Sequence, residues 1–341
     1  MSASLVVQTS FIGDVILTTP LIARLATQGA VDVVTTPAGA GVLANNPNVR
    51  ELIVYDKRGA DRRPAGLLRT VSRLRRAQAR HGTPPRCAYL AQGSTRSALL
   101  ALAAGYEQRI GFDTSSGSWW YTDKVHYHGD WHHARRLLSL ANESQASAVD
   151  HAQLRPLLYP GDAERHAVDM LLARVTRPFI AIAPGSVWET KRWPYYPELA
   201  RLLMDAFDVV IVGAPGDSAL VNDVLREPWV IDATGALSLL GSAELLSRAA
   251  AIVTNDSAPQ HLASGVGTPT VTVYGPTVPR FGFGPLAPES DVVEHPALAC
   301  RPCNSHGPHR CPLGHWRCMR DISAGHVYES VLNVIHSGPQ S

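Results

Sequence analysis

The chain has 341 residues, of which 45% are hydrophobic and 18% charged, and its formal net charge at pH 7 is +2. This composition excludes a disordered protein, and the length is sufficient for two domains that each bury a core. Every apolar run is shorter than the roughly 18 residues of a membrane-spanning helix, and Asp14 interrupts the first one, unlike the pattern of a secretory signal. We therefore expect a cytoplasmic protein with reduced cysteines.

Short apolar runs alternate with amphipathic segments through the first half of the chain. Strands are predicted at 5–7, 31–34, 52–55, 88–90 and 109–111. Helices are predicted at about 15–25, 65–80, 97–104 and 131–142. This alternation is typical of a parallel, doubly wound α/β sheet.

A proline-containing segment at 154–161 is predicted to be a linker, so that the domains run over 1–158 and 159–341. The alternation then restarts, with strands predicted at 179–183, 209–212, 230–232, 251–254 and 270–274, and a C-terminal helix at 325–335. Two α/β halves joined by a short linker are expected to leave an interdomain cleft, which is a usual place for a ligand.

A polar corner follows the strand predicted at 251–254. Ser257 fits the N-cap of a helix, and Pro259 fits its first turn, where a missing N–H has no cost. A helix starting there directs backbone N–H groups toward the carboxyl end of the strand, together with Asp256 and His261. Two explanations fit this corner, an anion or nucleotide site and a capped connection without a ligand.

Two further loops follow strands of the second half. The loop 184–194 combines Ser186 with Lys191 and Arg192, a set that suits a pyrophosphate. The alternative is an ordinary exposed loop, which its two tryptophans disfavour. Asp217 follows the strand at 209–212, where an acidic residue either binds ribose hydroxyls or caps a helix.

Asp14 follows the first strand of the chain. A carboxylate there either removes a proton from a substrate hydroxyl or caps the next helix. Farther along, the segment 57–80 holds many cations against the single acid Asp61: Lys57, Arg58, Arg62, Arg63, Arg69, Arg73, Arg75, Arg76 and Arg80. Three interpretations fit this cluster: a site for a phosphorylated acceptor, a surface that contacts an anionic membrane, and a solvated helix face. Nucleic acid is disfavoured, because no recognised binding motif accompanies it.

Four cysteines lie close together near the C-terminus, in the pattern Cys300-x2-Cys303-x7-Cys311-x6-Cys318. Four thiols at such spacing can bind a structural zinc or iron ion tetrahedrally. The second pair lacks the two-residue spacing of the first, so reduced thiols that pack a loop explain the pattern equally well.

Two other patterns bear on the class of enzyme. The segment 39–44 matches the Gly-x-Gly-x-x-Ala dinucleotide pattern, which would suit an NAD-dependent oxidoreductase, but it follows the second predicted strand and not the first. An Asp-x-Asp pattern, the metal-binding signature of many sugar transferases, is missing from the sequence.

Three motifs, in this order, resemble those of the family 9 glycosyltransferases, the ADP-heptose:lipopolysaccharide heptosyltransferases. They are Ser10-Phe11-Ile12-Gly13-Asp14, Pro184-Gly185-Ser186 with Lys191-Arg192-Trp193-Pro194, and Thr254-Asn255-Asp256-Ser257 with His261 and Tyr274-Gly275-Pro276-Thr277. The cysteine segment resembles the tail of heptosyltransferase II-type members. The resemblance covers nearly the whole chain.

The resemblance implies a GT-B fold of two Rossmann-like domains, the first binding the acceptor and the second the sugar nucleotide. It implies an inverting transfer of heptose from ADP-heptose to the inner core of lipopolysaccharide, in which no metal or other cofactor is required. Asp14 matches the catalytic base, and Lys191 matches the lysine that steadies the departing diphosphate. Donor-binding positions fall on Ser186, Asp256, Ser257 and His261, and more loosely on Asp217.

One position departs from the family pattern, because Ala258 stands where many members have glycine. This departure leaves open a different donor sugar or acceptor within the family. The sequence is also compatible with an NAD-dependent oxidoreductase and with a non-catalytic scaffold of the same fold. The expected partners are an ADP-sugar and a phosphorylated lipid or lipopolysaccharide acceptor, and the basic cluster allows peripheral contact with the inner face of the cytoplasmic membrane.

Overall fold

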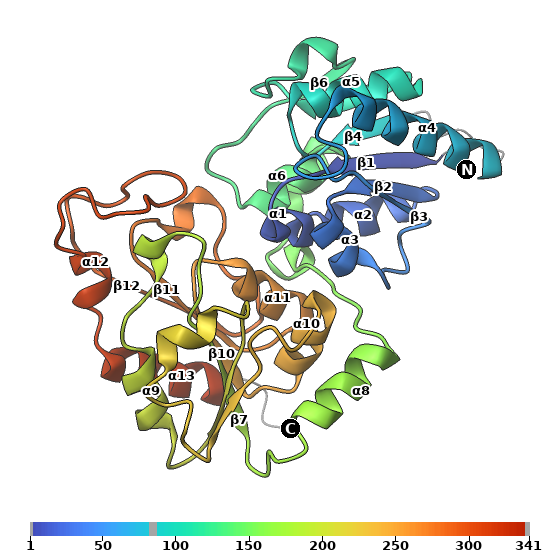
Figure 1. Cartoon of the computed structure of the whole chain (residues 1–341). Helices are drawn as coiled ribbons and strands as arrows, with labels where there is room; N and C mark the ends of the chain where they lie inside the picture. The colour runs from blue at the N-terminus through green and yellow to red at the C-terminus, as the bar shows by residue number, and fades with distance from the viewer. Residues whose placement is uncertain (1–2, 82–86, 338–341) are drawn as a thin grey trace. The chain divides into compact units, whose positions relative to one another are not determined.

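The computed structural model describes residues 3–81 and 87–337. The chain divides into two compact units, Met1–Tyr159 and Pro160–Ser341, and each is described by itself (Figure 1). Within the described residues, no helix has both the length and the apolar character needed to cross a membrane.

The first unit is built on a parallel sheet with the strand order β3-β2-β1-β4-β5-β6. Its strands are β1 Ser4–Gln8, β2 Val31–Thr35, β3 Glu51–Val54, β4 Cys87–Leu90, β5 Gln108–Phe112 and β6 Asp123–Val125. In the centre of the sheet, Val6 pairs with Val33 on one side and with Tyr89 on the other. The central strands are rich in valine and leucine because helices cover both faces of the sheet.

The helices of the first unit are α1 Ile12–Leu17, α2 Thr19–Ala26, α3 Pro37–Leu43, α4 Pro64–His81, α5 Thr95–Ala104, α6 His133–Ser139 and α7 Glu143–Ala148. The single helix predicted at 15–25 is wrong, since the chain breaks at Thr18 between α1 and α2. Pro20 has no N–H to donate to the Ile16 carbonyl. That carbonyl instead accepts the hydroxyl of Thr19 at 2.9 Å.

The second unit is built on another parallel sheet, with the order β12-β11-β10-β7-β8-β9. Its strands are β7 Phe179–Ala183, β8 Asp208–Ile211, β9 Val230–Asp232, β10 Ala251–Asn255, β11 Thr270–Tyr274 and β12 Ser290–Glu294. Its helices are α8 Asp162–Leu171, α9 Tyr196–Leu203, α10 Leu239–Ser247, α11 Ala258–Val266, α12 Arg317–Arg320 and α13 Ala324–His336. Helix α13 turns Val327, Val331 and Val334 into the core because they lie on one helical face.

Both sheets have the same topology when the strands are counted within each unit. The order is 3-2-1-4-5-6, which is that of a Rossmann fold. The chain reverses its direction of winding between β1 and β4 in the first unit and between β7 and β10 in the second. Loops on the two sides of such a point diverge, so a ligand can reach the carboxyl ends of the strands. The topology thus directs attention to the residues that follow these four strands.

The Gly-x-Gly-x-x-Ala segment lies away from these points. Most of it belongs to α3, which follows β2, and β2 is not a switch-point strand. A Cβ atom on Gly39 would lie 2.2 Å from the Thr35 hydroxyl oxygen and 3.1 Å from Cγ2 of Val15. The close packing of α3 on β2 and α1 therefore explains this glycine, and the prediction of a dinucleotide loop has no support here.

Candidate active site

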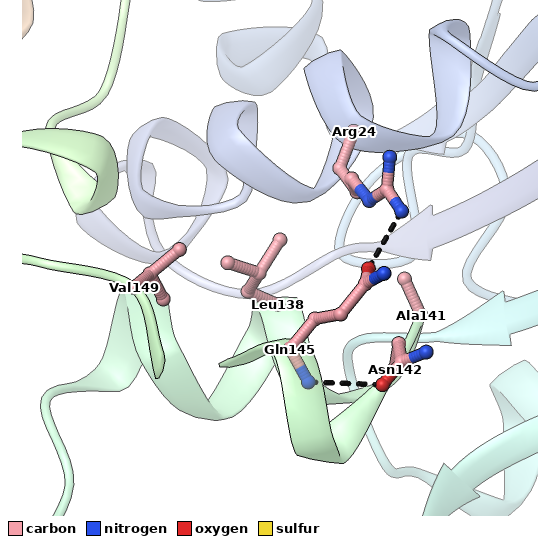
Figure 2. A pocket seen from close by; sticks show the side chains of 6 residues that line it. All are labelled: Arg24, Leu138, Ala141, Asn142, Gln145 and Val149. Atoms are coloured by element: carbon pink, nitrogen blue, oxygen red, sulfur yellow. Dashed lines mark hydrogen bonds between the residues drawn. The ribbon is translucent and has the colours of Figure 1, made fainter. Parts of the chain in front are cut away.

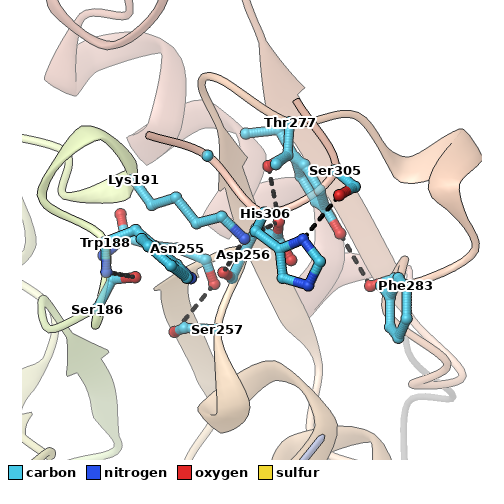
Figure 3. Close-up of polar contacts among 12 residues, drawn as sticks. Ser186, Trp188, Lys191, Asn255, Asp256, Ser257, Thr277, Phe283, Ser305 and His306 are labelled. Atoms are coloured by element: carbon cyan, nitrogen blue, oxygen red, sulfur yellow. Dashed lines mark hydrogen bonds and ion pairs between the residues drawn. The ribbon is translucent and has the colours of Figure 1, made fainter. Parts of the chain in front are cut away.

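The Asp256 carboxylate is the centre of a polar cluster at the β7–β10 switch point (Figure 3). Its Oδ2 accepts hydrogen bonds from Nζ of Lys191 at 2.6 Å and from the hydroxyl of Thr277 at 2.7 Å. Nε2 of Gln260, one helical turn farther along, lies 3.4 Å from Oδ1. The loops after β7, β10 and β11 thus meet at one carboxylate.

Lys191 brings a largely buried positive charge to this point. Its side chain is 10% exposed and that of Asp256 is 12% exposed. Nζ also contacts the Asp256 main-chain carbonyl at 3.3 Å, so that two of its three N–H bonds are directed at Asp256. An ammonium group held in this way is a fixed, poorly hydrated charge, and such a charge interacts strongly with a second anion.

Asn255 holds the loop that carries Lys191 in place, a role that the sequence did not reveal. Its side chain is buried, and Nδ2 donates to the Pro184 carbonyl at 2.9 Å while Oδ1 accepts the Trp193 N–H at 3.1 Å. Within the loop, Nε of Arg192 donates to the Ser186 carbonyl at 2.9 Å. The predicted residues Ser186 and Lys191 are therefore positioned by a side chain from the neighbouring strand.

Asp217 lies against the same loop. Its Oδ2 accepts the Ala214 N–H at 2.8 Å, so the residue does cap its own turn. A Cβ atom on Gly185 would lie 2.1 Å from this oxygen, and one on Gly213 would lie 2.5 Å from it. The carboxylate therefore packs directly on two glycine backbones, next to Ser186, and both of its predicted roles are compatible with its position.

Ser257 stands at the N-cap of α11, but its hydroxyl does not cap the helix. The hydroxyl lies 3.3 Å from the Asn255 carbonyl and 3.4 Å from the Thr254 hydroxyl, because the side chain turns back toward the strand. The first backbone N–H groups of α11 therefore donate no hydrogen bond to the Ser257 side chain. His261 is more deeply placed than the other predicted residues, at 4% exposure, and its Nε2 lies 3.3 Å from Nε2 of Gln260.

Asp14 lies in the first unit, at the carboxyl end of β1. Helix α1 starts at Ile12, earlier than predicted, and Asp14 lies in its first turn, where Oδ2 accepts the Phe11 N–H at 3.2 Å. Oδ1 lies 3.2 Å from Nε2 of His133, at the start of α6, and the two side chains are 18% and 12% exposed. The carboxylate therefore supports the helix start and also lies within hydrogen-bonding distance of a histidine that the sequence did not reveal.

The basic segment 57–80 separates into two parts in the structure. Lys57 donates to the Thr9 hydroxyl at 3.3 Å, and the Arg58 guanidinium lies over the Phe11 ring at 5.4 Å from its centre. Burial lowers the pKa of Lys57, and the nearby charge of Arg58 lowers it further. Both cations thus border the turn that leads to Asp14.

The arginines of α4 have mainly structural partners. Arg69 and Arg73 pair with the buried Asp61 at 3.0 Å and 3.5 Å, and Arg75 donates to the Ala103 carbonyl at 2.7 Å. Arg80 pairs with Glu51 of β3. These contacts fasten α4 to its neighbours, while Arg69, Arg73 and Arg80 stay 51%, 44% and 62% exposed, as the interpretation of a solvated helix face expects.

The cysteine segment holds thiols of unequal acidity. Burial raises the pKa of Cys311, but hydrogen bonds from backbone N–H groups outweigh it, with Trp316 contributing most, and the net pKa is lowered. Burial raises the pKa of Cys318 to about 11. Cys300, Cys303 and Cys311 border one cavity of about 160 Å³. Within the described part of the chain, no group of three or more ligating side chains is arranged to hold a metal ion, and the metal site stays a prediction.

A cavity of about 310 Å³ lies elsewhere in the first unit, between α2, α6 and α7 (Figure 2). It is lined by Arg24, Leu138, Ala141, Asn142, Gln145 and Val149. The cation of this lining, Arg24, donates to Oε1 of Gln145 at 2.6 Å. None of the predicted site residues lines the cavity, so we assign it no part in the active site.

Two Rossmann-like units with polar residues after their switch-point strands define a glycosyltransferase of the GT-B class. Residues 86–313 match the model of glycosyltransferase family 9 (heptosyltransferase), and the chain belongs to this family. It is 28% identical to lipopolysaccharide heptosyltransferase 2 of Escherichia coli K12, over 85% of this chain and 87% of that protein.

Solved structures agree with this assignment. The structure of E. coli ADP-heptose LPS heptosyltransferase II superposes with a TM-score of 0.79 and 26% identity, covering 98% of this chain and 99% of that one. A family 9 glycosyltransferase from Veillonella parvula has the same fold, with a TM-score of 0.84 and 22% identity, over 99% of this chain and 98% of that chain.

Proposed function

We propose that this chain transfers a heptose from ADP-heptose to an acceptor in the inner core of lipopolysaccharide, with inversion at the anomeric carbon. The observation that carries the proposal is the buried Lys191 ammonium at the β7–β10 switch point, where a Rossmann fold binds the phosphates of a nucleotide. The names of the related heptosyltransferases support the choice of donor and acceptor.

The second unit holds the donor in this proposal. Lys191 neutralises the charge that develops on the diphosphate as the bond to the sugar breaks. The N-terminus of α11 adds backbone N–H groups directed toward the same anion, and the hydroxyls of Ser186 and Ser257 add hydrogen bonds. Asp217 binds the ribose hydroxyls. His261 contacts Gln260, which in turn contacts Asp256, and it acts on the donor site through these two residues.

Asp14 is the general base in this proposal. Its carboxylate takes the proton of the acceptor hydroxyl while the hydroxyl oxygen attacks the anomeric carbon. The bond between that carbon and the diphosphate oxygen breaks, and its electron pair leaves with ADP. Because attack and departure occur on opposite sides of the carbon, the configuration inverts. His133 holds the Asp14 carboxylate in position for this step.

Lys57 and Arg58 bind the anionic groups of the acceptor, since both lie beside the turn that carries Asp14. Arg62 and Arg63, which are exposed and lie between this pair and α4, extend the same positive region. The acceptor is a lipid, and we propose that this region also approaches the anionic cytoplasmic surface of the inner membrane.

A metal ion at the cysteine segment is a separate proposal. We propose that Cys300, Cys303, Cys311 and Cys318 bind a structural zinc or iron ion, in agreement with the lowered pKa of Cys311 and with the cavity that three of the cysteines share. Elemental analysis of protein purified without added metal tests it. About one equivalent of zinc or iron supports the site, and metal-free protein in which all five cysteines titrate as thiols after unfolding overturns it.

The proposed reaction is tested by mass spectrometry of the products formed from ADP-, UDP- and GDP-sugars with heptose-deficient lipopolysaccharide. We expect one added heptose with ADP-heptose alone. Transfer from another nucleotide sugar would overturn the donor assignment and leave the family assignment intact. The alanine at position 258 is compatible with such an outcome. Tight binding of ADP without any transfer would instead indicate a non-catalytic protein.

A further inference from the structure

The cysteine segment is fastened to both sides of the proposed donor site. The Cys303 N–H donates to the Pro276 carbonyl at 2.8 Å, just after β11. On the other side, the buried hydroxyl of Thr190 donates to the Pro308 carbonyl. The residues between these two anchors therefore have little freedom to leave the loops that surround Lys191.

Gly307 lies directly on the Lys191 side chain. It is buried and has a φ of +83°, which glycine adopts without strain. A Cβ atom here would lie 3.3 Å from Cε of Lys191 and 3.1 Å from Cγ of Pro276. The backbone of the cysteine segment thus forms part of the surface that confines the ammonium group.

His306 is the neighbour of Gly307 and is exposed. Its Nδ1 lies 2.7 Å from the Ser305 hydroxyl, and its ring meets the edge of Trp188 at a centroid distance of 6.3 Å. Trp188 also packs on His309 at 4.5 Å. Figure 3 shows His306 and Ser305 together with Lys191, Asp256 and Thr277. The imidazole is therefore held by Ser305 and Trp188, one residue from the glycine that contacts Lys191.

We propose that His306 is a further binding residue of this site and that it donates a hydrogen bond to the diphosphate of the nucleotide sugar. The inference rests on the proposed function, because it takes the ligand of Lys191 to be a diphosphate. When the Ser305 hydroxyl donates to Nδ1, the remaining ring hydrogen is on Nε2, which is then a donor. Lys191 is a single point charge, and a diphosphate offers many acceptor oxygens that a second donor can serve.

The structure gives the cysteine segment a role in this arrangement. Anchored at Cys303 and Pro308, it places Gly307 against Lys191, with His306 as the adjacent residue. Disturbing the segment should therefore weaken the binding of a diphosphate more than the binding of a monophosphate.

The test compares the affinities of ADP and AMP for the full chain by isothermal titration calorimetry. We expect His306→Ala to weaken ADP binding about tenfold, the effect of losing one hydrogen bond to a charged group, and to change AMP binding less than about twofold. His306→Gln, which keeps an N–H near the position of Nε2, should restore most of the ADP affinity. His326→Ala, at an exposed histidine on α13, is the matched control and should bind both nucleotides like the unmodified chain.

The outcomes distinguish a failure of the proposed function from a failure of the inference about His306. If the unmodified chain does not bind ADP, the proposed function fails and this inference fails with it. If it binds ADP and His306→Ala binds equally well, only the inference is overturned. Equal losses for ADP and AMP would also overturn it, because the histidine would then act on the adenosine or on the fold. Melting temperatures of the variants identify any unfolded protein, and His306→Gln then provides the decisive comparison.

Discussion

Nε2 of His133 lies 3.2 Å from Oδ1 of Asp14, although α6 and α1 are far apart in the sequence. The other carboxylate oxygen accepts the Phe11 N–H, so the group is held from two directions. A carboxylate oriented in this way does not have to change rotamer before it accepts a proton from an incoming hydroxyl, and this favours general-base catalysis.

Replacing Asp14 by Asn should lower kcat at least about 100-fold, since the amide cannot accept the proton of the acceptor. ADP affinity should remain within about twofold, because the proposed donor residues all lie in the second unit. Turnover and calorimetric ADP binding, measured on one protein sample, check both parts. An Asp14→Asn variant with undiminished kcat would require another base. His133→Gln should cost less, since the Phe11 contact persists.

Lys191→Ala should lower both the transfer rate and the stability of the protein. The rate should fall by about 100-fold or more, because the leaving diphosphate loses its counter-charge. The free energy of unfolding should fall by about 3 kcal/mol, because the Asp256 carboxylate remains buried without its cation. Urea unfolding of the single variant and of a Lys191→Ala, Asp256→Ala double variant checks the second statement. The double variant should be the more stable of the two, and the reverse order would contradict the explanation.

Gly185→Ala should weaken ADP binding by about tenfold through Asp217. The new methyl group would lie 2.1 Å from the Asp217 carboxylate oxygen, so the carboxylate must leave its position. Gly216→Ala is the matched control in the next loop, because Gly216 has φ −86° and a Cβ atom there meets no other atom within 4 Å. Equal ADP affinities for the two variants would remove Asp217 from the donor site.

Lys57→Met should raise the KM of a phosphorylated acceptor about tenfold, the effect of one charge-assisted hydrogen bond, and should leave the KM of the donor unchanged. Arg76→Met is the control, because Arg76 is exposed and its Nε donates to the Ser72 carbonyl of its own helix. If both variants raise the acceptor KM to the same extent, the basic segment acts through its total charge and not through Lys57.

Alkylation by iodoacetamide at pH 8 should modify Cys311 before Cys318. The reactive species is the thiolate, and the pKa of Cys311 is lowered by backbone N–H groups, whereas burial raises that of Cys318 to about 11. Peptide mapping by mass spectrometry at short reaction times gives the order. Protection of both residues in metal-loaded protein would in addition support the proposed metal site, while preferential labelling of Cys318 would contradict the thiolate assignment.

The sequence predicted the central strands and two of the four edge strands, β3 and β9. Runs such as Phe179–Ala183 and Thr270–Tyr274 are fully buried, and their continuous apolar character identifies them. The edge strands Asp123–Val125 and Ser290–Glu294 were missed, because each has only one packed neighbour and carries exposed polar residues. Local pattern is informative where both faces of a strand are covered. Its value at the sheet edge varies, because β3 and β9 are also edge strands and were predicted.

The same limit applies to the candidate site. Ser186, Lys191 and Asp256 could be predicted because each follows a strand in a recognisable motif. The functions of Asn255 and His133 depend on which strands and helices become neighbours. Asn255 reaches Pro184 only because β10 pairs with β7, and no periodicity within either segment encodes that pairing. The position of His306 likewise depends on the contacts that its segment makes with Pro276 and Thr190.

All the contacts described for the proposed donor site, from Pro184 to His309, are made within residues 160–341. In the proposed reaction, nucleotide preference is therefore a property that one half of the gene can carry. A chimera that joins residues 1–159 of this chain to the second half of a relative should take its sugar-nucleotide choice from that relative. Recombination between family members could change donor and acceptor preferences independently, without a new active site having to evolve.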